Sequence, residues 1–168
     1  MRRWRLPFTG AELWLGLSIA AADQITKALV SRSLALHETV EIVPGLVNLV
    51  HVRNTGAAFG LLNAADFPYK PVVVVLMAVV ALTVITLYAG RFGSETPAAR
   101  LGLVLIVAGA LGNLVDRATM GYVVDFVDVY WGGAHFWAFN VADASITVGA
   151  ALLILDMLFA REHVSTTA

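Results

Sequence analysis

The sequence contains nineteen consecutive residues without a charged side chain, Val72–Gly90. Pro71 precedes this stretch, and proline is favoured in the first turn of a helix. Because a helix rises about 1.5 Å per residue, a segment of this length covers roughly 30 Å, the thickness of the hydrocarbon core of a bilayer. The stretch therefore predicts a helix that crosses a membrane.

Three further apolar stretches occur, at Leu13–Val30, Leu101–Val115 and Val141–Ala160. Of the 168 residues, 59% are hydrophobic and 14% are charged, whereas soluble domains have about 25% charged residues. Long uninterrupted runs favour helices over the alternating pattern of membrane barrels. We predict an all-α membrane protein, a single domain over residues 1–168 with four transmembrane helices. These helices are expected at about 12–31, 71–90, 99–117 and 140–160, with loops at 32–70 and 118–139.

The first of these loops is too polar for another span. It contains two short runs rich in β-branched and aliphatic residues, Glu41–Val43 and Leu46–Arg53, on either side of Pro44-Gly45. This pattern predicts two strands around a turn. The second loop is rich in aromatic residues, which are favoured at the membrane interface. We therefore expect a small β element next to the membrane, formed from the first loop.

Basic residues are distributed unevenly over the two sides of the predicted bundle. With four spans, both termini share the side that holds Arg2, Arg3, Arg5, Arg91, Arg100 and Arg161. The opposite side holds Arg32, Arg53, Lys70, Arg117 and most of the acidic residues. The positive-inside rule then predicts cytoplasmic termini and an extracytoplasmic β element. The helix ends that carry Asp23, Asp116 and Asp143 are expected to meet near the outer face.

The composition excludes several classes of function. No Cys is present, which rules out a thiol nucleophile, a thiolate metal site and a disulfide. The four His do not follow HExxH spacing, so a helical zinc-peptidase site has no support. The net charge of −1 gives no attraction to nucleic acid. We expect neither a metal nor another cofactor.

Charged groups at membrane depth are costly, and several occur near the outer helix ends. Asp125 lies in a locally apolar run, and Asp143 lies three residues after Asn140 at the start of a predicted helix. Two carboxylates brought together away from water share one proton, as in the aspartic-protease pair that is the standard example of this effect. Such a pair can act as general base and general acid on a peptide bond. Asp125 and Asp143 are therefore candidates for a catalytic pair.

Structural interpretations of the same residues remain open at this point. Asp23 and Lys27 are four residues apart, as in a helical ion pair, and Asp143 could simply benefit from the helix dipole. Asp116 and Arg117 could simply end a helix. Asp128 and Asp156 are assigned to solvent or to the interface. The glycines Gly102, Gly109 and Gly112 are expected to allow close helix packing.

Five segments together resemble bacterial lipoprotein signal peptidases, the signal peptidase II family. The segments are Asp23–Lys27, Arg53–Phe59, Gly109–Arg117, Val123–Phe126 and Phe139–Ile146, in this order. Each motif is weak alone, but five in order and at the right spacing are specific. The resemblance covers about residues 12–158 and implies a four-helix aspartic peptidase of the bacterial inner membrane. Its expected substrate is a prolipoprotein whose lipobox Cys carries diacylglycerol, cut just before that Cys.

The resemblance also implies roles for individual residues and partners. Asp125 and Asp143 match the catalytic pair. Asp116 is the rival for Asp125, but the neighbouring Arg117 would keep it ionised, which suits a structural role. The other matching positions shape or support the site: Asp23, Lys27, Asn54, Gly56, Asn113, Asp116, Arg117 and Asn140. The implied partners are membrane lipid and cyclic peptide inhibitors such as globomycin, and the chain is expected to act as a monomer.

Two other classes of function compete with the peptidase. A small transporter or channel could use the acidic cluster as an ion path. Against this, the acids gather at one end of the helices, whereas transporters usually place their site at the membrane midplane. A non-catalytic assembly subunit would tolerate replacement of the acids by amides.

Overall fold

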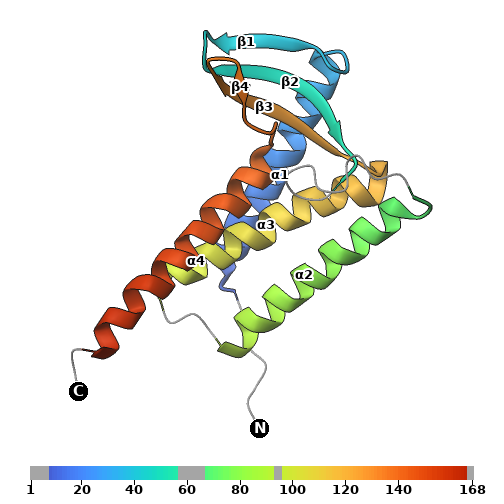
Figure 1. Cartoon of the computed structure of the whole chain (residues 1–168). Coiled ribbons are helices and arrows are strands. Elements are labelled where there is room, and N and C mark those ends of the chain that lie inside the picture. The colour runs from blue at the N-terminus through green and yellow to red at the C-terminus, as the bar shows by residue number, and fades with distance from the viewer. Residues whose placement is uncertain (1–7, 57–66, 93–95, 166–168) are drawn as a thin grey trace.

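The computed structural model describes residues 8–56, 67–92 and 96–165. Four helices run side by side below a small sheet (Figure 1). The elements in chain order are α1 (Gly10–Ser33), β1 (Thr39–Val43), β2 (Val47–Asn54), α2 (Lys70–Phe92), α3 (Pro97–Met120), β3 (Val123–Trp131), β4 (Ala134–His135) and α4 (Val141–Ser165). Residues 1–7 and 57–59, which include three of the predicted cytoplasmic arginines and the end of the second motif, lie outside the described residues, as do the side chains of Arg91 and Arg161.

Capping residues explain where the helices begin and end. Thr9 and Glu12 form a reciprocal capping box at the start of α1. Thr96 caps α3, and Pro97 occupies the first turn, where its missing N–H costs nothing. The same helix ends at Gly121, whose φ of 78° is a conformation that glycine adopts without strain.

Helices α1, α3 and α4 pack against one another, and α2 packs chiefly on α3. Glycines allow the close approach of α3 and α4, as the sequence predicted. A Cβ atom at Gly102 would lie 2.7 Å from the carbonyl oxygen of Gly149, and one at Gly109 would lie 2.3 Å from that of Ala142. The first turn of α4 is therefore held directly against the backbone of α3.

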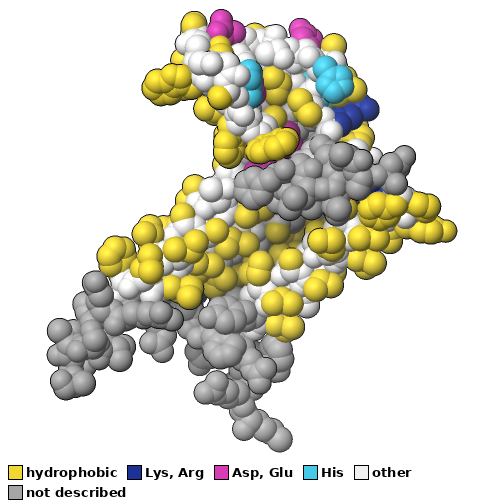
Figure 2. All heavy atoms as spheres, in the orientation of Figure 1, with side chains coloured by type: hydrophobic (Ala, Val, Ile, Leu, Met, Phe, Trp, Pro, Cys, Tyr) yellow, Lys and Arg dark blue, Asp and Glu magenta, His cyan; other side chains and the backbone are white. Residues whose placement is uncertain are grey.

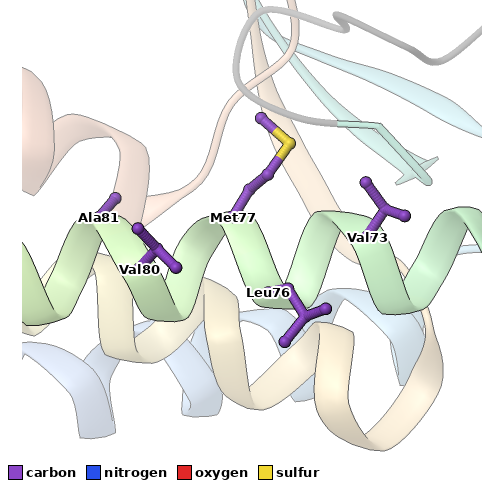
Figure 3. Close-up of a pocket in the computed structure, with 5 residues that line it drawn as sticks. All are labelled: Val73, Leu76, Met77, Val80 and Ala81. Atoms are coloured by element: carbon purple, nitrogen blue, oxygen red, sulfur yellow. The ribbon is translucent and has the colours of Figure 1, made fainter.

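Among the described residues, three helices are long and apolar enough to cross a membrane, Gly10–Ser33, Pro97–Met120 and Val141–Phe159. Hydrophobic side chains cover the helices in the view of Figure 2, and acidic and histidine side chains appear on the sheet above them. Helix α2 has a shorter apolar part, Lys70–Ile85. A hollow on α2 is lined only by apolar side chains (Figure 3): Val73, Leu76, Met77, Val80 and Ala81.

The sheet is larger than the sequence predicted. It has four antiparallel strands in the order β1-β2-β3-β4, whereas only the first two were expected. Strands β1 and β2 lie close to the predicted runs. The connection between α3 and α4, predicted as the loop 118–139, contains two strands that the sequence analysis did not expect, β3 and β4. Strand β3 interleaves Asp125 and Asp128 with apolar residues, and its pairing with β2 buries these acids at a place where a sequence pattern favours exposure.

Candidate active site

The first turn of α4 places Asp143. Asn140 immediately precedes the helix, and its Oδ1 accepts the N–H of Asp143 at 2.9 Å. In return, the backbone N–H of Asn140 donates to Asp143 Oδ2 at 3.3 Å. This reciprocal arrangement satisfies N–H groups that a helix start leaves free, and it fixes the Asp143 carboxylate at the positive end of the helix dipole.

Strand β3 places Asp125. Its partner strand β2 has an irregular register between Leu49 and Val52, and Val52 lies opposite Asp125. Irregularities of this kind re-aim side chains near functional sites. The Asp125 carboxylate, which is only 3% exposed, accepts Asn140 Nδ2 at 2.6 Å and Asn54 Nδ2 at 3.1 Å.

Two asparagines connect these carboxylates into one network. Asn113 on α3 donates its Nδ2 to Asp143 Oδ1 at 2.8 Å. Asn140 donates its Nδ2 to Asn113 Oδ1 at 3.2 Å as well as to Asp125. The two predicted catalytic acids, which lie far apart in sequence, are thus linked through two asparagines that are hydrogen-bonded to each other.

Burial changes the acidity of Asp125. The apolar surroundings disfavour its charged form, and the negative charge of Asp143 adds to this effect. Together they raise the pKa of Asp125 from 3.8 to about 7, although hydrogen bonds from Asn54 and Asn140 oppose the shift. A carboxyl group that keeps its proton near neutral pH can act as a general acid.

A second pair of carboxylates, those of Asp23 and Asp116, shares the side chain of Lys27. Lys27 Nζ is 2.7 Å from Asp23 Oδ2 and 2.9 Å from Asp116 Oδ2, and all three side chains are almost completely buried. The sequence interpretation expected Arg117 to hold Asp116 ionised, but Lys27 forms the ion pair. The expectation that a cation accompanies Asp116 was correct, and the identity of that cation was wrong. Helix α1 carries Lys27 to Asp116, a contact that sequence neighbours do not reveal.

Arg117 instead reaches the end of β2. Its guanidinium donates to the carbonyl oxygen of Gly56 at 2.9 Å and to that of Asn113 at 3.3 Å. Gly56 in turn donates its N–H to Asn54 Oδ1 at 3.0 Å. Because Asn54 Oδ1 accepts this bond, its Nδ2 is directed toward Asp125. Arg117 and Gly56 therefore orient Asn54, which donates a hydrogen bond to the Asp125 carboxylate.

Sequence reasoning missed Gln24. Its Nε2 lies within hydrogen-bond distance of Asp116 Oδ1 (2.8 Å), the Gly112 carbonyl oxygen (3.2 Å) and Asp23 Oδ2 (3.3 Å). The available signal was a polar amide inside an otherwise apolar helix, between Asp23 and Lys27. The residue stands in a motif that the sequence analysis quoted without assigning it a role.

Two other acids lie apart from this site. Asp128 was assigned to solvent or interface, but it is only 7% exposed and accepts Asn48 Nδ2 at 2.9 Å. The cross-strand pairing of Asn48 with Asp128 explains this burial. Asp156 is half-buried and hydrogen-bonded to Thr96, so it joins α3 to α4. Across residues 8–56, 67–92 and 96–165, no group of three His, Asp or Glu residues could hold a metal ion.

Comparison with known proteins gives the family. The chain matches the model of signal peptidase (SPase) II over residues 15–159. The chain belongs to this family. A lipoprotein signal peptidase of Geobacter sulfurreducens is 46% identical over 136 residues, which are 81% of this chain and 84% of the relative. One of Symbiobacterium thermophilum is 41% identical over 144 residues, which are 86% and 91% of the two chains.

The fold agrees with that of a solved bacterial membrane enzyme. A structure described as a bacterial membrane enzyme at 2.3 Å resolution has a TM-score of 0.82 and 28% identity. The match covers 96% of this chain and 93% of that one. Membership of the signal peptidase II family confirms the prediction of a membrane aspartic peptidase, and it does not favour the transporter or channel alternative.

Proposed function

We propose that this protein removes the signal peptide from prolipoproteins whose lipobox Cys already carries diacylglycerol, cutting the peptide bond just before that Cys. Family membership and relatives named lipoprotein signal peptidase support this substrate class. The observation that carries the proposal is the pair of acids joined through one amide: Asn140 contacts both Asp125 and Asp143.

Asp125 and Asp143 are the proposed catalytic pair. We assign the ionised form to Asp143, which is the more open of the two and faces backbone and amide N–H groups at the start of α4. Asp125 holds the shared proton, consistent with its pKa of about 7. The residues proposed to support this pair are Asp23, Lys27, Asn54, Gly56, Asn113, Asp116, Arg117 and Asn140.

Hydrolysis then proceeds without a covalent bond between the enzyme and the substrate. Asp143 takes a proton from water as the water oxygen attacks the carbonyl carbon of the scissile bond. Asp125 gives its proton to the carbonyl oxygen, which yields a tetrahedral diol. When this intermediate collapses, Asp143 passes its proton to the leaving amine of the Cys residue. Asp125 recovers its proton from the diol, and the carboxyl terminus of the signal peptide forms. No metal or cofactor is required.

The lipidated substrate would reach this site from within the bilayer, where its acyl chains remain solvated by lipid. We place α2 as a fourth transmembrane helix of the single domain 1–168, and the wholly apolar lining of its hollow (Figure 3) is compatible with contact with lipid. Family membership supports an inner-membrane location, and the arginine bias supports cytoplasmic termini with an active site near the periplasmic face. A monomer suffices, because one chain supplies both acids.

Cyclic peptides such as globomycin are proposed as inhibitors. A peptide that resembles a blocked substrate would compete for the same pair of carboxylates. Purified protein should therefore lose cleavage in the presence of globomycin, with the apparent KM rising and kcat unchanged.

The direct test uses purified protein in detergent and a diacylglyceryl-modified prolipoprotein. We expect Asp125→Asn and Asp143→Asn to reduce cleavage by at least about 1,000-fold, because each removes one half of the acid–base pair. Asp128→Asn is the matched control, since it changes a buried acid on the same strand.

Helicity and thermal stability are compared first, so that only folded variants are interpreted. A metal chelator should have no effect on the wild type. Retained cleavage by folded Asp125→Asn would move the catalytic role to Asp116. Absence of cleavage by the wild type would contradict the proposed substrate.

A further inference from the structure

Asp23 and Asp116, here called the rear carboxylates, each bind the backbone N–H of the residue before one of the proposed catalytic acids. Asp23 Oδ1 accepts the N–H of Ala142 at 2.9 Å, and Ala142 precedes Asp143. Asp116 Oδ2 accepts the N–H of Val124 at 3.4 Å, and Val124 precedes Asp125. The position of each rear carboxylate therefore fixes the backbone that carries one catalytic acid.

Helix α1 ties these two carboxylates together. Lys27 Nζ lies 2.7 Å from Asp23 and 2.9 Å from Asp116. Gln24 Nε2 lies 3.3 Å and 2.8 Å from the same two side chains. One cation and one amide thus bridge the same pair of acids, at a depth where Asp23 is fully buried and Asp116 is 1% exposed.

Lys27 makes a third contact that reaches the catalytic pair. Its Nζ donates to Asn113 Oδ1 at 3.0 Å. An amide whose oxygen faces an ammonium group must present its NH₂ on the other side, and Asn113 Nδ2 donates to Asp143 at 2.8 Å. Lys27 therefore also fixes the orientation of a hydrogen bond to the base.

Close packing limits how far the rear carboxylates can shift. A Cβ atom at Gly112 would lie 2.6 Å from Asp23 Oδ2, so this carboxylate lies directly against the backbone of α3. Since a buried charge is costly without a partner, Asp23 and Asp116 are both held close to the one ammonium group of Lys27.

We propose that Lys27 and Gln24 are positioning residues that set the separation of Asp125 and Asp143 by holding Asp23 and Asp116 at a fixed spacing. The inference rests on the proposed function for its catalytic consequence. The structural part of the proposal, that the carboxylates hold the Val124 and Ala142 amides in place, does not depend on that function.

The test compares Lys27→Met and Gln24→Met, both close in size to the original side chain, with Thr26→Val as the matched control. Thr26 lies between them on α1, and its hydroxyl donates only to carbonyl oxygens of the same helix, those of Ala22 and Asp23. Each full-length variant is purified in detergent, and kcat and KM are measured on the diacylglyceryl prolipoprotein. Amide hydrogen exchange is recorded residue by residue.

Lys27→Met is expected to lower kcat by about 100-fold with KM nearly unchanged, since a displacement of about 1 Å in a catalytic group costs that much. Gln24→Met should lower kcat by roughly fivefold, the effect of one hydrogen bond. In both variants the amides of Val124 and Ala142 should exchange faster, by about tenfold in Lys27→Met. Exchange at Val127, whose N–H bonds to Phe139, should not change. Thr26→Val should match the wild type.

The inference is overturned if the Val124 and Ala142 amides exchange at wild-type rates in the folded variants, or if kcat stays at the wild-type value in both. If Lys27→Met does not fold, Gln24→Met decides by the same two measurements. If the wild type does not cleave the substrate but the two amides respond as expected, the proposed function fails while the positioning of the two backbones stands.

Discussion

The molecule contains two clusters of hydrogen-bonded acids, one at the helix ends and one on the outer sheet. The helix-end cluster comprises the proposed catalytic pair, the rear carboxylates and the polar side chains between them, and it joins α1, α3, α4, β2 and β3. The outer-sheet cluster comprises Glu41, Asn48, Asp128, Tyr130 and His135, all on strands.

The clusters differ in their access to water. In the outer-sheet cluster, Asp128 is buried, but its partner His135 is 53% exposed and stacks on Tyr130. Glu41 accepts the hydroxyl of Tyr130, and this bond, with the N–H of Gly45, lowers the pKa of Glu41 in an exposed position. In the helix-end cluster, Lys27 and Asp116 are 3% and 1% exposed.

This difference determines what each cluster can do. Where water reaches the groups, it replaces a lost partner, so such pairs contribute little to stability. Where water is absent, each charge depends on one protein partner, and removing that partner moves the others. Hydrogen-bonded acids are therefore expected to give local support on the sheet, and to control the proposed chemistry at the helix ends.

The largest contrast is expected between two matched buried acids, one in each cluster. Asp116→Asn should lower kcat/KM for prolipoprotein cleavage by about 100-fold, because it weakens the contact to Lys27 and the anchor of Val124. Asp128→Asn should change it by less than about threefold, because it affects only the contacts with Asn48 and His135, which lie outside the site. Steady-state kinetics of both folded variants checks this. Equal losses of kcat/KM in the two variants would contradict the proposed difference between the clusters.

Stability should depend on pH through the helix-end cluster. Since the pKa of Asp125 is raised from 3.8 to about 7, the folded state keeps a proton that the unfolded state releases in this range. The free energy of unfolding therefore decreases as pH rises from about 4 to about 7, by roughly 4 kcal/mol at most. Asp125→Asn should lack this decrease. Unfolding curves of both proteins at several pH values measure it, and parallel pH dependences would contradict the shift.

Packing of α3 on α4 should matter more than packing of α3 on α1. Gly109→Ala places a methyl group 2.3 Å from the Ala142 carbonyl oxygen, so it should destabilise the fold by about 1–3 kcal/mol and reduce cleavage by displacing Asp143. Gly16→Ala is the matched control on α1, because its methyl group would meet nothing closer than 3.8 Å. Thermal unfolding and cleavage rates are compared. Equal effects at both glycines would show that crowding at Ala142 is unimportant.

The smallest effect is expected at the exposed edge of the outer sheet. Tyr130→Phe removes the hydroxyl that bonds to Glu41 and to the N–H of Gly45. The free energy of unfolding should fall only slightly, because water replaces the lost partner of an exposed group, and cleavage should not change. The acid titration of Glu41, followed by NMR, should move up toward its ordinary pKa because its largest stabilising bond is lost. A large loss of activity would extend the functional cluster into the sheet.

The sequence predicted the helices well because their apolar runs are long and their caps are local. It predicted β1 and β2 from a turn between short apolar runs. It missed β3, since Val123–Trp131 becomes a strand only by pairing with β2, a contact between distant segments. The same limit applies to Gln24, whose three acceptors lie on α1 and α3.

The sequence by itself determined the membrane character and the family, and it predicted which acids form the site, because apolar length, charge at membrane depth and motif order are all local features. Only the tertiary structure decided which groups face one another. It paired Lys27 rather than Arg117 with Asp116, and it buried Asp128 beside Asn48. Such pairings follow from how buried helices and strands pack, and the cost of leaving a charge without a partner then selects one arrangement.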